Sequence, residues 1–166
     1  MTNALDRLRS LRVADVMTRD VVQVSSLQSI LDVARKFVEH DVTAAPVTDS
    51  TGRCIGFFSA ADFLRRELHV RQKASPDGDP TSNDAQGLGG VSRYMSSVVR
   101  SFSPGESLLS AARVMCEHHL HRLPVVDDGG RVVGIVSTMD VVAALVNAID
   151  EMEAGKFAPG FPPPGI

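Results

Sequence analysis

Two serine–aspartate pairs have the residue types and spacing that best suit ligand chemistry: Ser59 with Asp62, and Ser137 with Asp140. In each pair the serine ends a strand-like run, and the aspartate falls in the first turn of the helix-like run that follows. A helix start attracts phosphate through its unpaired N–H groups and its dipole, while a carboxylate can accept hydrogen bonds from both hydroxyls of a ribose. Each pair therefore suits the phosphate and sugar of a nucleotide. The same residues are common helix caps, so a purely structural role stays open.

These pairs belong to a unit that occurs twice. Residues 13–65 recur without a gap at residues 91–143, with an offset of 78 positions. The offset relates Met17 to Met95, Ala34-Arg35 to Ala112-Arg113, Glu39-His40 to Glu117-His118, Pro46-Val47 to Pro124-Val125, Gly56 to Gly134, Ser59 to Ser137 and Asp62 to Asp140. Repeated units usually bury their apolar faces against one another. Because two copies are too few for a solenoid, we expect a closed pair with a cleft between the copies.

Each copy shows the same change of hydrophobic periodicity. A short β-branched run precedes a helical i, i+3, i+4, i+7 pattern, and two strand-like runs around a polar, Gly-containing turn precede a second helix. In the first copy these elements fall at 21–24, 30–38, 45–47, 55–58 and after residue 59; in the second they fall at 98–99, 108–118, 123–126, 132–136 and from residue 139 onward. The pattern predicts two β-α-β-β-α units and an α+β fold.

Composition changes mark the domain boundaries. We expect a first repeat at residues 10–72 and a second at residues 91–152. Residues 73–90 lack apolar periodicity and are rich in Gly, Pro and Asp, which predicts a flexible linker. Residues 153–166 form a Pro-rich tail, for which we expect a frayed end.

Three strings carry a resemblance to a known family. Asp15-Val16-Met17-Thr18, the run from His121 to Asp127 and the run from Gly134 to Asp140 resemble the CBS domain, named after cystathionine β-synthase. The resemblance covers about residues 10–150, in the order and spacing of the family. It implies a tandem pair, often called a Bateman module, whose two units pack about a pseudo-two-fold axis and leave two clefts. Adenine-containing ligands occupy such clefts in family members that bind them: AMP, ADP, ATP, S-adenosylmethionine, NAD or cyclic di-AMP.

The resemblance also implies roles for individual residues. The family assigns the aspartate to the ribose and the serine or threonine to the phosphate, which carries over to both pairs in this chain. The residues for which we expect ligand contact are Ser137, Thr138, Asp140, His121, Arg122, Pro124, Ser59, Asp62, Ala45 and Thr18. Residues 60 and 61 are both alanine, which removes polar groups from the first cleft and departs from the family pattern.

Arg122 distinguishes the two repeats. Its planar guanidinium would offer phosphate oxygens two parallel hydrogen bonds, and the string that begins at His121 is similar to the γ subunits of AMP-activated protein kinase, where such residues meet phosphates. The first repeat has Ala44 at the equivalent position, so we expect the two clefts to differ in phosphate affinity. Three roles stay open for Arg122: in the cleft of Asp140, in that of Asp62, or on the surface with a packed stem.

The four residues Cys116, His118, His119 and His121 support a rival hypothesis. Thiolates and imidazoles are zinc ligands, but positions 118, 119 and 121 of a helix end do not share a face, and no metalloenzyme spacing is present. We therefore expect no metal site. The sequence also has no P-loop, no Rossmann loop and no recognised nucleophile motif, so we expect a protein that is not an enzyme.

The bulk composition narrows the partners. The chain has 166 residues, of which 43% are hydrophobic, and a formal net charge of −3, which predicts a globular protein with no reason to bind nucleic acid. Its longest apolar stretch, residues 141–146, is far shorter than the roughly 20 residues that span a bilayer. Residues 1–12 contain no apolar leader segment. We therefore expect a cytoplasmic protein without a membrane partner.

The leading hypothesis is a regulatory module for energy sensing that binds an adenine nucleotide, with no required cofactor and with AMP, ADP, ATP or S-adenosylmethionine as the bound ligand. One alternative is a structural dimerisation module with vestigial clefts, and another is the metal-binding protein described above. The last helix, at residues 141–152, has apolar residues on more than one face, which predicts a homodimer. The effector protein that it would regulate is not identified by the sequence.

Overall fold

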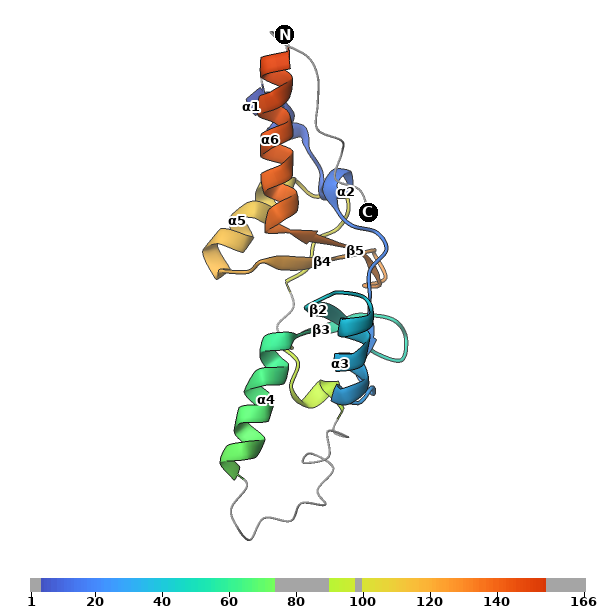
Figure 1. Ribbon diagram of the computed structural model, residues 1–166. Helices are drawn as coiled ribbons and strands as arrows, with labels where there is room; N and C mark the ends of the chain where they lie inside the picture. Colours follow the sequence, from blue (N-terminus) through green and yellow to red (C-terminus); the bar gives the residue numbers. More distant parts are fainter. Residues whose placement is uncertain (1–3, 74–89, 98–99, 155–166) are drawn as a thin grey trace. The chain divides into compact units, whose positions relative to one another are not determined.

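The computed structural model describes residues 4–73, 90–97 and 100–154 and has the mixed α+β content that the sequence predicts (Figure 1). The helices are α1 (Ala4–Ser10), α2 (Val13–Val16), α3 (Ile30–Glu39), α4 (Ala60–Lys73), the 3-10 turn η1 (Val91–Arg93), α5 (Leu108–His118) and α6 (Thr138–Ala154). The strands are β1 (Val24–Ser25), β2 (Ala44–Thr48), β3 (Cys54–Ser59), β4 (Arg122–Val126) and β5 (Val132–Ser137). No helix among these residues is long and apolar enough to cross a membrane.

The order of helix, hairpin and helix in each repeat is as expected, but the strand that should open each repeat is reduced. In the first repeat only β1, at Val24–Ser25, is a strand, and it pairs in parallel with β2. In the second repeat Phe102 forms the equivalent parallel bridge to β4, while the expected strand at residues 98–99 lies outside the described residues. The proposed linker and tail also fall largely outside them. A β-branched run alone does not set where a strand finds its partner, since register depends on the neighbouring strand.

The chain folds into two compact units that do not follow the two repeats. The C-terminal unit contains residues 1–21 and 100–166, and the central unit contains residues 22–99. The segment that leads each repeat therefore belongs to the unit built around the other repeat's hairpin. Thr18 exchanges two backbone hydrogen bonds of 2.9 Å with Ile135 in β5, and Ser96 exchanges bonds of 2.9 and 3.0 Å with Phe57 in β3.

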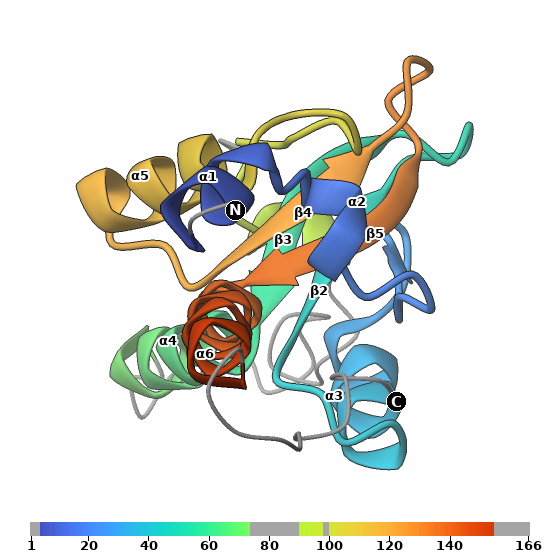
Figure 2. The same cartoon turned by 90° about the horizontal axis from the view of Figure 1, so that it is seen from above.

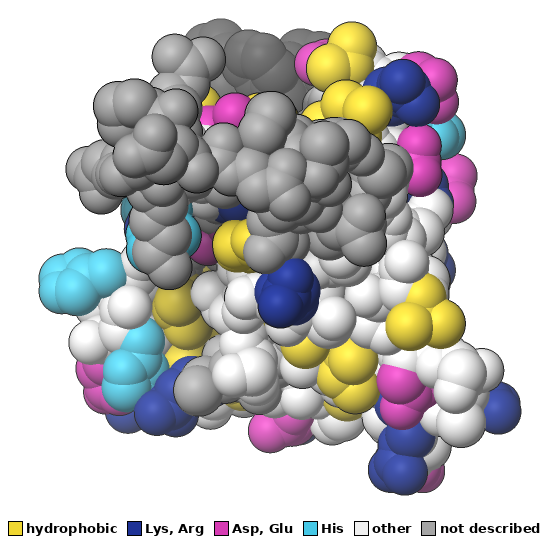
Figure 3. Space-filling model, turned by 90° about the horizontal axis from the view of Figure 1, so that it is seen from below, with side chains coloured by type: hydrophobic (Ala, Val, Ile, Leu, Met, Phe, Trp, Pro, Cys, Tyr) yellow, Lys and Arg dark blue, Asp and Glu magenta, His cyan; other side chains and the backbone are white. Residues whose placement is uncertain are grey.

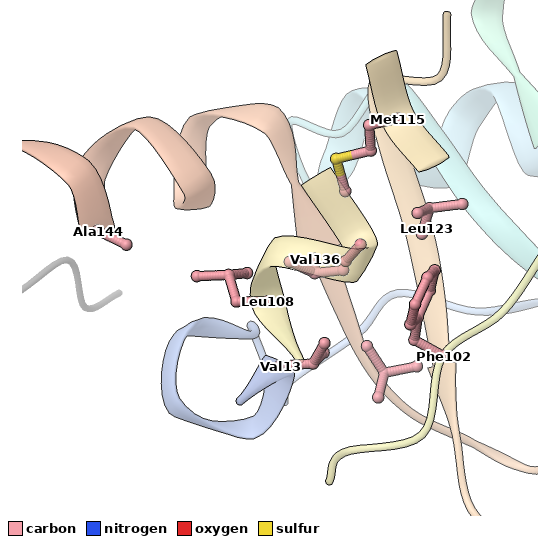
Figure 4. Close-up of a cluster of buried hydrophobic side chains, with 9 residues drawn as sticks. Val13, Phe102, Leu108, Met115, Leu123, Val136 and Ala144 are labelled. Atoms are coloured by element: carbon pink, nitrogen blue, oxygen red, sulfur yellow. The ribbon is translucent and has the colours of Figure 1, made fainter. Parts of the chain in front are cut away.

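Each unit has its own hydrophobic core, and a residue from the exchanged segment is fully buried in it. Val13 packs in the C-terminal unit, where Figure 4 shows it beside Leu108 and Val136. Val91 occupies the equivalent place in the core of the central unit. Burial of an apolar side chain of this size contributes about 1.5–3 kcal/mol relative to exposure. The exchanged segments are thus integral parts of the units that receive them.

The helix α1 was not predicted from the sequence. It lies against α5 and α6 (Figures 1 and 2), and Arg7 forms an ion pair with Glu151 near the end of α6. Its seven residues are too few for a stable helix in isolation. Packing against α6 therefore explains a helix that local periodicity does not indicate.

Two glycines allow the exchanged segments to approach the hairpins. A β-carbon at Gly134 would lie 2.6 Å from Met17 Sδ and 3.1 Å from the carbonyl oxygen of Thr18. A β-carbon at Gly56 would lie 2.5 Å from Met95 Sδ in the same way. The repeated glycine is therefore a packing requirement of both units.

We expect Gly134→Ala to destabilise the protein by about 1–3 kcal/mol, because the methyl group forces Met17 and the adjoining backbone to move. Urea unfolding followed by circular dichroism measures the change. Gly105→Ala is the matched control, since nothing lies within 4 Å of a β-carbon at Gly105. Equal stability of the two variants would contradict the close approach at Gly134.

Candidate functional site

The Ser137–Asp140 pair joins the end of β5 to the first turn of α6. The Ser137 N–H and hydroxyl donate to Asp140 Oδ2 at 2.6 and 2.7 Å, and the Asp140 N–H donates back to Ser137 Oγ at 3.2 Å. This reciprocal arrangement is a capping box. The pair therefore has the helix-cap role that the sequence left open. The same hydrogen bonds hold the Asp140 carboxylate in place at the helix start.

The Ser59–Asp62 pair forms the same box at the start of α4. The Ser59 N–H and hydroxyl donate to Asp62 Oδ2 at 2.9 and 2.6 Å, and the Asp62 N–H donates to Ser59 Oγ at 3.3 Å. Here Arg65 Nη1 also donates to Asp62 Oδ1 at 2.9 Å, so both carboxylate oxygens are engaged. The Asp62 side chain is only 10% exposed.

The two aspartates therefore differ in what they can still accept. Ala143 replaces Arg65 in the second repeat, and within the described part of the chain no side chain is bonded to Asp140 Oδ1. Asp140 is also less buried than Asp62. Among the described residues, Asp140 Oδ1 accepts no side-chain hydrogen bond whereas Asp62 Oδ1 accepts one from Arg65, so Asp140 is the carboxylate more open to ligand hydroxyls.

The structure places seven of the ten predicted site residues in the C-terminal unit. Arg122 lies directly opposite Ser137 in the β4–β5 register, so their side chains share one face of the hairpin. The Thr138 N–H donates to the carbonyl oxygen of His121 at 3.0 Å. The seven residues are Thr18, His121, Arg122, Pro124, Ser137, Thr138 and Asp140. Arg122 thus belongs to the same unit as Asp140.

The other three predicted residues, Ala45, Ser59 and Asp62, lie in the central unit. Ala44 stands opposite Ser59 in the register, where the C-terminal unit has Arg122. Ser96 takes the place that Thr18 has in the other unit. Sequence reasoning missed Ser96, although the repeat offset from Thr18 points to it.

A pocket of about 340 Å³ lies beside this second box. It is lined by Asp62, Arg65, Arg66, His69 and Tyr94, all from the central unit. Apart from Asp62, none of these was a predicted site residue. The four that lie on α4 are spaced at positions i, i+3, i+4 and i+7, from residue 62 to residue 69, and this spacing is the sequence signal that they share one helix face.

The metal hypothesis finds no support in the described residues. No group of three or more His, Cys, Asp or Glu side chains there is arranged to hold a metal ion. Cys116, His118, His119 and His121 are all exposed or partly exposed at the end of α5, and the chain turns at His119, whose φ is 53°.

The visible described side chains on the face in Figure 3 mix basic, acidic and hydrophobic groups. The described side chains of this face form no single basic patch.

Comparisons with known proteins agree with the fold and identify the family. The family model for the CBS domain matches residues 13–69 and 91–147. The CBS domain-containing protein YhcV of Bacillus subtilis is 32% identical over 144 residues, which cover 87% of this chain and 90% of that protein. A homoserine O-acetyltransferase of Methanohalophilus mahii is 32% identical over 139 residues, which cover 84% of this chain but only 25% of the enzyme. The crystal structure of CBSX2 in complex with AMP superimposes with a TM-score of 0.68 at 28% identity, covering 82% of this chain and 96% of that chain.

Proposed function

This chain belongs to the CBS-domain family, and we propose that it is a regulatory module that binds an adenine nucleotide or a related adenosyl ligand at Ser137 and Asp140. The observation that carries the proposal is the capping box at the start of α6, which holds Asp140 through its Oδ2 and leaves its Oδ1 without a side-chain donor among the described residues. The AMP complex of the similar protein CBSX2 supports the choice of ligand class.

The geometry suggests how each part of such a ligand would be held. The ribose hydroxyls would donate to Asp140 Oδ1, because its Oδ2 already accepts two hydrogen bonds from Ser137. The phosphate would lie near the start of α6, where the helix dipole and N–H groups favour an anion. Arg122, across the hairpin from Ser137, would supply a charge-assisted contact.

The regulatory output would pass through α6. Its first turn carries Asp140, and farther along one face it exposes apolar residues at helical spacing. These residues are Val142, Leu145, Val146, Ile149 and Met152, each 43% to 51% exposed. Because Asp140 and this apolar face belong to the same helix, a ligand bound at Asp140 would also act on the face. We propose that a second copy of the chain covers the face and that assembly is the property regulated.

We expect the native chain to be a dimer and Leu145→Glu to shift it towards monomer, because a charge in an apolar interface is costly to bury. Light scattering coupled to gel filtration at tens of micromolar measures the change. Leu27→Glu, at an exposed leucine of the central unit, is the control and should leave the dimer intact. A native chain that is entirely monomeric would contradict the proposal.

A thermal-shift screen tests the function directly. The panel is AMP, ADP, ATP, S-adenosylmethionine, NAD and cyclic di-AMP, with GMP as the control for base selectivity. We expect at least one adenosyl ligand to raise the melting temperature in a saturable way and GMP to do so less. If no member of the panel shifts the transition, the sensor proposal fails and a structural dimerisation module with vestigial sites remains.

A further inference from the structure

The pocket beside α4 contains a buried arginine with an open edge. The Arg66 side chain is only 4% exposed, and its Nη1 pairs with Glu67. Its Nε and Nη2 are buried and have no hydrogen-bond partner within the described part of the chain. Buried donors are almost always paired in native proteins. These two unpaired nitrogens therefore indicate a site where a ligand accepts their hydrogen bonds.

The two open nitrogens have the geometry of a binding fork. Nε and Nη2 lie on one edge of the planar guanidinium, and their N–H groups run nearly parallel. That edge matches two oxygens of a carboxylate or phosphate and forms two parallel charge-assisted hydrogen bonds. Glu67 contacts Nη1, on the other side of the guanidinium, so this edge of Arg66 has no partner among the residues that the structure describes.

The remaining lining residues decide what size and charge of ligand fits. Arg65 adds a second guanidinium, although Asp62 already accepts a hydrogen bond from it. His69 and the Tyr94 side chain add groups that donate hydrogen bonds. Because Asp62 and Glu67 offset part of the positive charge, the pocket suits a small oxyanion rather than a polyanion.

The second repeat shows that the fold does not require an arginine here. Ala143, Ala144 and Asn147 are the equivalents of Arg65, Arg66 and His69. Ala144 is buried in the core of the C-terminal unit (Figure 4), and Val16, the equivalent of Tyr94, packs against the same core. The central unit thus has a polar pocket where the other unit has apolar packing.

We propose that Arg66 is the centre of a phosphate-binding site in the central unit, with Arg65, His69 and Tyr94 completing it. The phosphate is either the free inorganic ion or the end group of a small phosphate monoester. This site is separate from the one proposed at Asp140, which lies in the other unit. The two proposals therefore stand or fall independently.

Titration of the ¹⁵N-labelled full-length chain with inorganic phosphate tests the site. The ionic strength is held constant with chloride, and the Arg66 Nε–H resonance is followed by NMR. We expect a saturable shift of this resonance, and no comparable shift for Arg35, an exposed arginine of the same unit. An Arg66 resonance that does not move, or that moves linearly in parallel with Arg35, would overturn the proposal.

A second test compares how much phosphate raises the melting temperature of the native chain and of arginine variants. The native chain and Arg35→Met should be stabilised equally, whereas Arg66→Met should lose the site-specific part of the stabilisation. Arg66→Lys keeps the charge but not the fork, so we expect it to bind phosphate about ten-fold more weakly. Because phosphate also stabilises proteins by exclusion from their surface, equal stabilisation of all four proteins would refute a specific site. If Arg66→Met does not fold, the NMR titration of the native chain decides.

Two further experiments identify the source of the phosphate and distinguish the Arg66 site from the ligand site proposed at Asp140. Tighter binding of glycerol 2-phosphate than of inorganic phosphate would assign the site to an ester, and the reverse order would assign it to the free ion. Asp140→Ala should leave the phosphate response of Arg66 unchanged. Loss of that response in Asp140→Ala would show that phosphate binds at the other unit and would overturn the Arg66 site.

Discussion

The melting temperature of the native chain is expected to rise by about 5–10 °C with AMP at about 100 times its dissociation constant, and Asp140→Ala is expected to remove most of this rise. Ligand at that concentration stabilises the folded state by about 2.7 kcal/mol, and about 1 kcal/mol shifts the transition of a protein of this size by roughly 2–4 °C. The loss follows because Asp140 Oδ1 is the acceptor proposed for the ribose. Differential scanning fluorimetry with and without AMP measures it.

The control for this experiment must separate ligand contact from helix capping. Asp140 accepts two hydrogen bonds from Ser137, so its removal destabilises α6 by about 0.5–2 kcal/mol even without ligand. The quantity compared is therefore the ligand-induced shift of each variant, not its melting temperature. Asp62→Ala is the matched control, and its ligand-induced shift should stay near the native value because Arg65 occupies Asp62 Oδ1. Equal losses in both variants would contradict the asymmetry between the two boxes.

Arg122→Ala is expected to weaken AMP binding by roughly ten- to a hundred-fold while changing adenosine binding little. A charge-assisted contact to a phosphate contributes about 1.5–3 kcal/mol, which corresponds to that range of dissociation constants. Arg122 lies across the hairpin from Ser137, whereas the central unit has the uncharged Ala44 at this place. Isothermal titration calorimetry with AMP and adenosine measures both affinities and the number of sites.

Two comparisons make the Arg122 experiment specific. Arg131→Ala removes an exposed arginine from the other end of the same hairpin and should leave both affinities unchanged. Arg122→Lys keeps the charge without the planar fork, so its affinity for AMP should fall between those of the native chain and Arg122→Ala. Unchanged AMP affinity in Arg122→Ala, or two equal AMP sites in the native chain, would show that Arg122 is only a surface residue.

Local features of the fold could be predicted because short-range interactions determine them. Helical periodicity indicated α3 and α5, and polar Gly-containing turns indicated both hairpins. The two serine–aspartate boxes were also predictable, since a capping box involves residues only three positions apart. The repeat offset correctly paired Gly56 with Gly134, but it did not show why a glycine is needed there.

The sequence did not predict that the segment leading each repeat would pack in the unit built around the other repeat's hairpin. Val13 and Val91 occupy equivalent positions in the two repeats, each four residues before a methionine, and this local pattern does not show which hairpin each will pack against. That choice is made by long-range packing against complete cores. The helix α1 was missed for the same reason, because it is stabilised by α5 and α6 rather than by its own periodicity.

The sequence alone was enough to identify the family and to nominate Ser137, Asp140 and Arg122, because residue types at fixed local spacing carry that information. Which aspartate keeps an available oxygen, and which arginine has an open edge, depends on side-chain contacts in three dimensions. Arg65 binds Asp62 where the other repeat has Ala143, and Arg66 is buried where the other repeat has Ala144. From sequence alone, a charged residue on a helix is predicted to be exposed, because charged side chains are rarely buried. Only the packing around it determines whether its polar atoms are buried and unpaired.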